Sequence, residues 1–431
     1  MSKEENRKNF SKYVSQNILG MIGFSCYVLA DSYFISIAKG ADGLTALNLV
    51  MPLYSIIFSI GEMIGVGSAI RYAISKIKKD ADADDYFWNA LIWCILSSML
   101  FVFAGIFFSA DIMRVLGADE HIVAVGNNYT KIFMCFAPMF MCNYVTNAFV
   151  RNDGAPGIAM SATLFSSLFN IVFDYILMFP MNLGMEGAAL ATALSPIIGM
   201  GICSIHFFSK KSSVRLVVCK PSVRKLVAGS QLGVSAFVGE MSSAVITLAF
   251  NFVILKLTGN VGVAAYGVVA NIAIVTTAVF NGVAQGSQPL ISSCFGRGDK
   301  DGCTQLKRMG YTTAFVLAAV MYSILFIFAE QFVAVFNSEG SEMLRLYATE
   351  GVKLYFIGIF FAGINIVGGG AFSATEDAFK AAVVSVARGF VLILGAVFVM
   401  SAFFGMTGVW LAYAVAEGIT TFIMLVMAMR V

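Results

Sequence analysis

Apolar residues dominate the chain in twelve long runs that short polar connectors separate. Each run is near or above the roughly 20 residues that an α-helix needs to cross a bilayer. The runs fall at 13–38, 44–74, 87–109, 121–150, 157–179, 186–208, 226–256, 261–293, 304–329, 343–371, 378–402 and 406–429. Connectors such as 76–85 and 296–302 carry charges and turn residues, and no stretch is left over for a soluble domain. The pattern predicts an all-α integral membrane protein with twelve transmembrane helices.

Composition agrees with this class, because 59% of the 431 residues are hydrophobic and only 12% are charged. The net charge of +3 is small and the basic residues lie in short loops, so we expect no nucleic-acid partner. The eight cysteines are scattered without a C-x-x-C or Cys/His cluster, which indicates packing residues and no metal site. No nucleophile motif or phosphate loop is present, and we therefore predict no enzyme activity and no cofactor.

The distribution of Lys and Arg predicts the orientation in the membrane. If the N-terminus is cytoplasmic, twenty-one of the 28 basic residues lie on the inner side, four on the outer side and three within spans. The inner set includes Arg151, which we assign to the connector 151–157. We expect a multi-pass protein with both termini in the cytoplasm.

The chain repeats itself. The stretch GMEGAALA at 184–191 returns as GMTGVWLA at 405–412. Further matches, 219 to 223 residues apart, pair Gly67-Ser68 with Gly286-Ser287, Lys131 with Lys353, and Ala148-Phe149 with Ala371-Phe372. Because each half has six spans, both halves face the same way and are related by a pseudo-two-fold axis along the membrane normal. We predict an N-terminal lobe at 1–209, a cytoplasmic linker at 210–225 and a C-terminal lobe at 226–431.

Four polar side chains reach one depth in the first half. With a rise of 1.5 Å per residue, Asp31 lies roughly 27 Å along an outward-running helix and Asp174 roughly 25 Å along another. Asn170 lies one turn before Asp174, and Thr192 is roughly 9 Å down an inward-running helix. Two adjacent carboxylates in hydrocarbon favour uptake of a proton or of a small cation, and oxygen ligands suit H⁺ or Na⁺ rather than zinc. The alternative is that both acids are solvated caps at helix ends.

Other charged residues also fall within the predicted spans. Glu240, roughly 21 Å along the seventh helix, is either a site for a cationic substrate or a proton, or a satisfied structural residue. We expect Arg388 and Glu417, at similar depths in neighbouring helices, to form an ion pair. Glu62 lies toward the inner end of the second helix, where it can face a cytoplasmic vestibule.

Several motifs, spread over nearly the whole chain, resemble one family. They are ADSYFIS at 30–36, GVGSAIRYAISK at 65–76, NIVFD at 170–174, GMEGAALATALS at 184–195, GVAQGSQPLISSCFGRGD at 282–299 and GMTGVWLA at 405–412. The chain resembles multidrug and toxic compound extrusion (MATE) transporters, of the DinF-like branch of bacterial and archaeal exporters. The resemblance implies a V-shaped pair of lobes.

In that family the cation or proton site matches Asp31, Asn170, Asp174 and Thr192, and a glutamate on helix seven of some members matches Glu240. Two features depart from the family. The prolines that members often carry in helices one and seven are missing, and helix ten offers Asn365 where some sodium-coupled members have Asp.

The resemblance and the buried acids together predict a secondary active antiporter. It would export organic, cationic or amphipathic compounds in exchange for H⁺ or Na⁺ by alternating access, from the plasma (inner) membrane of a prokaryote. We expect a functional monomer whose partners are a small organic substrate and the lipid bilayer. The alternatives are a lipid-linked precursor flippase of the same superfamily, a narrow-specificity metabolite exporter, and a receptor or channel that does not pump.

Overall fold

The structure is a computed structural model that describes residues 3–336 and 341–429, and within these ranges all regular secondary structure is helical. The first half of the chain forms α1 (Lys3–Lys78), α2 (Asp85–Val115), α3 (Glu120–Cys135), α4 (Ala137–Asn152), α5 (Pro156–Met178) and α6 (Gly184–Phe207). The second half forms α7 (Val223–Gly296), α8 (Lys300–Ile327), α9 (Ala329–Phe336), α10 (Glu342–Tyr355), a 3₁₀ turn (Phe356–Gly358), α11 (Ile359–Ala374), α12 (Ala378–Val386), a π-helical turn (Ala387–Val391) and α13 (Leu392–Met429).

α1 and α7 each contain two membrane spans, and α12, the π-helical turn and α13 together contain two more. The chain reverses at Gly40 in α1, Gly259 in α7 and Gly405 in α13, where φ is 59°, 68° and 56°. A side chain with a Cβ disfavours this region of φ, which accounts for glycine at all three positions. α3 and α4 meet at a 46° bend and together make one span. α10, the 3₁₀ turn and α11 form another single span, Glu342–Ala374. Counted in this way, the described residues form twelve spans, and the predicted all-α membrane fold is confirmed.

The internal repeat is visible in the backbone as well as in the sequence. Positive φ angles occur in pairs that are 219 to 222 residues apart. The pairs are Gly40 with Gly259, Lys79 with Gly298, Gly154 with Glu376, and Gly184 with Gly405. Each pair marks the same turn of the two halves, so the two six-span units run through the membrane in the same order and direction.

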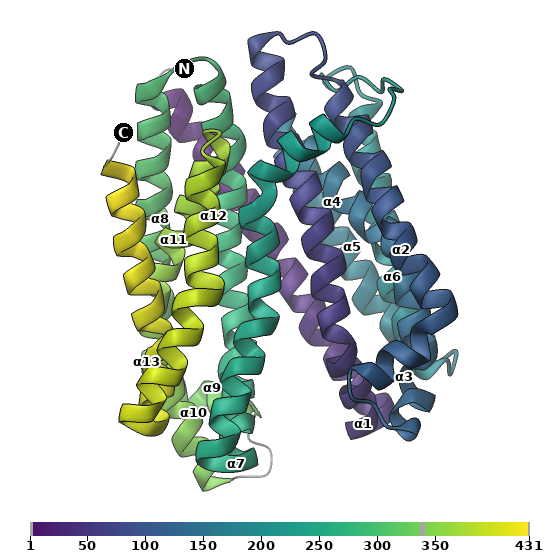
Figure 1. The fold of residues 1–431 in the computed structure, drawn as a ribbon, viewed down its shortest axis with the longest axis vertical. Helices are drawn as coiled ribbons and strands as arrows, with labels where there is room; N and C mark the ends of the chain where they lie inside the picture. The colour runs from purple at the N-terminus through teal and green to yellow at the C-terminus, as the bar shows by residue number, and fades with distance from the viewer. Residues whose placement is uncertain (1–2, 337–340, 430–431) are drawn as a thin grey trace.

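Two helical lobes lie side by side (Figure 1), each around its own hydrophobic core. The core of the first lobe includes Tyr129 and Phe149, and that of the second includes Trp410 and Phe280. The described ends of the chain lie at one end of the molecule, and the lobes diverge toward the other (Figure 1). Near its start α1 crosses to the second lobe, where Phe10 is buried in the second core.

Contacts between the lobes gather at the end that holds the termini. There α1 and α7 pack so closely that a Cβ added to Gly67 would lie 2.1 Å from the carbonyl oxygen of Gly229. A Cβ on Gly286 would likewise lie 2.8 Å from Cα of Val14. An ion pair between Arg71 of α1 and Glu376 also joins the two lobes at this end.

The segment between α6 and α7, residues 208–222, lies outside any helix and is anchored to the first lobe. Asp153, directly after α4, accepts hydrogen bonds from His206 Nε2 at 2.8 Å and from the backbone nitrogen of Ser213 at 2.9 Å. The predicted linker at 210–225 overlaps this segment and the start of α7. The domain bounds derived from the sequence stay a prediction.

Candidate functional site

Three of the four predicted site residues meet in a hydrogen-bonded cluster between α5 and α6. The Asn170 side-chain amide is oriented so that both its nitrogen and its oxygen form hydrogen bonds. In this orientation its nitrogen donates to Asp174 Oδ2 at 3.1 Å. Its oxygen accepts from the hydroxyl of Thr192 at 3.1 Å and from the Thr192 backbone nitrogen at 3.2 Å. Asn170 and Asp174 have no exposed surface and Thr192 is 2% exposed. The opposite face of α5 carries Leu168 and Tyr175, both more than half exposed, as a lipid-facing surface requires.

Asp31 completes the cluster from α1. It is 6% exposed, and its carboxylate is close enough to that of Asp174 for the two charges to interact. Among the described residues, no hydrogen-bond donor reaches Oδ1 of Asp31 or Oδ1 of Asp174. Two buried carboxyl oxygens without donors leave acceptor capacity that a proton or a small cation can fill. The interpretation of these acids as solvated helix caps is wrong, because both are buried.

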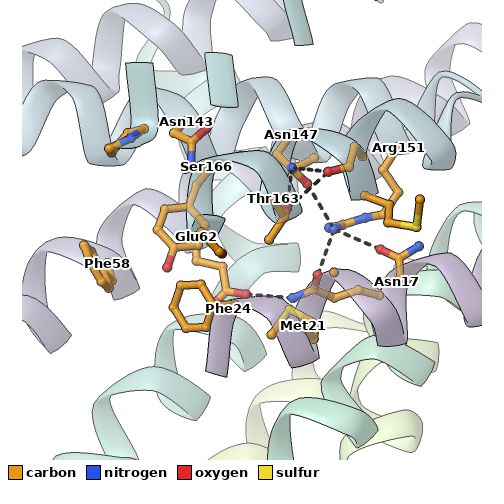
Figure 2. A pocket seen from close by; sticks show the side chains of 18 of the residues that line it. Asn17, Met21, Phe24, Phe58, Glu62, Asn143, Asn147, Arg151, Thr163 and Ser166 are labelled. Atoms are coloured by element: carbon orange, nitrogen blue, oxygen red, sulfur yellow. Dashed lines mark hydrogen bonds between the residues drawn. The ribbon is translucent and has the colours of Figure 1, made fainter. Parts of the chain in front are cut away.

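A second polar region, separate from the cluster around Asp174, lies between the two lobes and forms a pocket (Figure 2). First-lobe helices supply most of its lining, and α7 of the second lobe adds Glu240 and Gln285. The pocket is open to solvent and has a cavity volume of about 110 Å³. Its charged and amide groups are Asn17, Glu62, Asn143, Asn147, Arg151, Glu240 and Gln285, and its aromatic groups are Phe24, Tyr27, Phe58, Phe140 and Tyr144.

The amide of Gln285 joins a buried acid to a buried base inside this pocket. Arg151 Nη1 donates to Gln285 Oε1 at 2.7 Å, and Gln285 Nε2 donates to Glu62 Oε1 at 3.3 Å. Arg151 is 4% exposed and Glu62 is 8% exposed. Arg151 Nη1 also lies 3.5 Å from the side-chain oxygens of Asn17 and Asn147, contacts that Figure 2 draws as dashed lines. One side chain of the second lobe thus separates two opposite charges of the first.

Glu240 lies in the pocket and outside the cluster around Asp174. It is half-buried on α7, and its charge interacts with that of Glu62 across the cleft. Tyr27 of α1 is within electrostatic range of Glu240 and of Asp31, so it stands between the pocket and the cluster. The pocket therefore has two acids and one base among its lining residues.

The predicted ion pair between Arg388 and Glu417 is confirmed. Arg388 donates to Glu417 Oε1 from Nη2 at 2.7 Å and from Nε at 2.9 Å. Glu417 Oε2 accepts from Asn365 Nδ2 at 2.7 Å, and Asn365 Oδ1 accepts from Thr421 at 3.0 Å. Arg388 lies in the π-helical turn 387–391, and Glu417 is 2% exposed. These hydrogen bonds join four side chains of the second lobe, those of Arg388, Glu417, Asn365 and Thr421, in one network.

Two expectations about individual charges were wrong. Arg151, assigned to an inner connector, lies in the last turn of α4 and points into the pocket. Glu62, expected to face a cytoplasmic vestibule, is buried against Gln285. The spacing of Asn147 and Arg151 by one helical turn is the signal that could have revealed this surface, because both lie on one face of α4.

Comparison with known proteins gives a consistent result. A sequence model of the MatE family matches residues 17–176 and 236–399, one block in each lobe. The multidrug export protein MepA of Staphylococcus aureus strain MRSA252 is 27% identical over 414 residues, covering 93% of this chain and 89% of that protein. MepA of Staphylococcus saprophyticus is 26% identical over 409 residues, with the same coverage.

Solved structures share the fold. A MATE family transporter of the MOP superfamily in an outward-facing conformation superposes with a TM-score of 0.92 at 20% identity, covering 99% of this chain and 96% of that chain. A MOP superfamily transporter from Pyrococcus furiosus superposes with a TM-score of 0.91 at 20% identity and the same coverage.

Proposed function

The chain belongs to the MatE family of membrane transporters, and from that premise we propose that it is a secondary active antiporter that exports organic compounds in exchange for H⁺ or Na⁺. Membership of this family makes the chain a transporter of small molecules and not an enzyme. The curated relatives MepA are multidrug export proteins, and we extend multidrug export to this chain as part of the proposal. The organic compounds bind in the pocket around Glu62 and Glu240.

The observation that carries the proposal is the buried carboxyl pair. Asp31 and Asp174 are buried within electrostatic range of each other, and each keeps one oxygen without a donor among the described residues. The electrostatic cost of two such charges is relieved when H⁺ or Na⁺ binds, so the site responds to the gradient of that ion. Asn170 and Thr192 hold Asp174 in place and act as positioning or ligand groups.

Coupling requires that ion and substrate prefer opposite conformations of the two lobes. The inner end of the molecule is closed by the contacts of α1 with α7, and the lobes diverge at the other end (Figure 1). We assign this arrangement to the outward-facing state of an alternating-access cycle. We further propose that a single chain works as a monomer in a plasma membrane with both termini in the cytoplasm.

The composition of the pocket favours an exporter of cations over a flippase for lipid-linked precursors. An anionic headgroup calls for several basic side chains, whereas Arg151 is the one base among the lining residues and Glu62 and Glu240 are acids.

The test is ethidium efflux from proteoliposomes, with a proton gradient imposed in one set and a sodium gradient in another. Efflux driven by one of the gradients identifies the coupling ion. Asp31→Asn and Asp174→Asn should each reduce driven efflux at least about tenfold, toward the rate without a gradient. Asp111→Asn changes an exposed acid and serves as the matched control. Normal driven efflux in either of the first two variants would refute the site.

A further inference from the structure

The side chain of Gln285 occupies the position that a bound molecule would take between Glu62 and Arg151. Its amide offers an acceptor to a buried guanidinium at 2.7 Å and a donor to a buried carboxylate at 3.3 Å. Both charged groups belong to the first lobe, whereas Gln285 belongs to α7 of the second. The contact therefore exists only while the lobes are together at this end.

Close helix packing fixes Gln285 in this place. Glycines flank it one turn apart, and added Cβ atoms at Gly282 and Gly286 would lie 2.6 Å from Cα of Ile18 and 2.8 Å from Cα of Val14. α1 and α7 approach each other this closely only because neither glycine has a side chain. The approach brings the amide into the first lobe.

When the lobes separate at this end, Glu62 and Arg151 lose the amide. A buried guanidinium and a buried carboxylate are costly without hydrogen-bond partners. Among the described residues nothing accepts a hydrogen bond from Arg151 Nε, and nothing donates to Asn143 Oδ1 on the same pocket wall. The vacated position thus calls for a group with an acceptor and a donor side by side, with further polar groups in reach.

We propose that Gln285 is an internal competitor for substrate: a carboxamide-type group of the transported compound binds between Glu62 and Arg151 when the inner end is open, and Gln285 displaces it when the lobes close. The aromatic side chains of the pocket hold the apolar part of the same compound. This inference rests on the proposed export function and specifies its substrate class. Displacement makes binding weaker in the outward-facing state, as an exporter requires.

Two probes that differ in one N–H group test the inference. Procainamide and its ester analogue procaine share a cationic tail and an aromatic amine, and they differ in the linking group, where only procainamide has an N–H that can donate a hydrogen bond. Equilibrium binding of both is measured on purified protein, without any ion gradient. Wild-type protein, with Gln285 in place, should bind the two with similar affinity.

In Gln285→Ala the affinity for procainamide relative to that for procaine should increase about tenfold, which corresponds to the free energy of one charge-assisted hydrogen bond. Gln288→Ala, a buried glutamine on the same helix and outside the pocket lining, should leave the ratio unchanged. In the double variant E62Q/Q285A the shift should become smaller, because the acceptor is no longer charged. Gln285→Ser also empties this position and should reproduce the shift if the alanine variant folds poorly.

An unchanged ratio in both Gln285 variants, or an equal shift in Gln288→Ala, overturns the inference. The ethidium assay on wild-type protein separates this outcome from a failure of the antiport proposal. Driven ethidium efflux with an unchanged ratio refutes the competitor role alone. A shifted ratio without driven efflux refutes antiport and leaves the amide site standing.

Discussion

Replacement of Arg388 by methionine provides a quantitative test of the second-lobe network. The change removes two hydrogen bonds, at 2.7 and 2.9 Å, from a carboxylate that is 2% exposed. Asn365 Nδ2, at 2.7 Å, then remains as a donor to Glu417. Removing one partner of a buried ion pair costs about 3–5 kcal/mol, because the other charge is left without compensation.

Thermal unfolding of purified protein at one scan rate measures this effect. The midpoint of Arg388→Met should fall by the order of 5 °C. The double variant R388M/E417Q should recover most of the loss, because no buried charge remains. Arg345→Met breaks an exposed ion pair with Glu342 and should leave the midpoint unchanged. A single variant as stable as wild type, or a double variant no more stable than the single one, would contradict the reasoning.

Two further predictions concern the contacts that join the lobes at the end that holds the chain termini, which we propose is the inner end. Arg71→Glu should open this end and raise the labelling rate of a cysteine introduced at Asn147 from the inner side, while the charge-swapped double variant R71E/E376R should restore the wild-type rate. Gly286→Ala should open the same end, because its Cβ would overlap α1. Gly267→Ala on the same helix places its Cβ in open space and should leave labelling and stability unchanged. Equal labelling in the two glycine variants would contradict the packing argument.

The sequence could predict those features that depend on one helix at a time. Depth along a helix follows from a constant rise per residue, so the positions of Asp31 and Asp174 in their apolar runs are enough to assign both to one level. The pairing of Arg388 with Glu417 follows from the same rule. The repeat could be found because the turn glycines, such as Gly184 and Gly405, recur at a nearly constant distance along the chain.

The bridge made by Gln285 could not be predicted in this way. Its contacts with Glu62 and Arg151 depend on how the second lobe docks against the first. That docking is fixed by close approach at Gly282 and Gly286, and a pattern of apolar and polar residues carries no information on which helix lies opposite a glycine. The sequence therefore assigned Arg151 to a connector by its position at the end of an apolar run.

The two polar regions are connected through one helix. α1 carries Asp31 at the outer cluster, and it also carries Asn17, which lies 3.5 Å from Arg151 in the pocket. Asp31 and Asn17 are roughly 21 Å apart along α1, which is helical without a break between them. Before Asn17 the same helix packs against Gly286, and Phe10 ends in the core of the second lobe. Under the proposed antiport mechanism, a shift of α1 on ion binding at Asp31 would move the surface against which α7 holds Gln285. We expect variants that stiffen or loosen α1 between these positions to change coupling while both sites keep their own ligands.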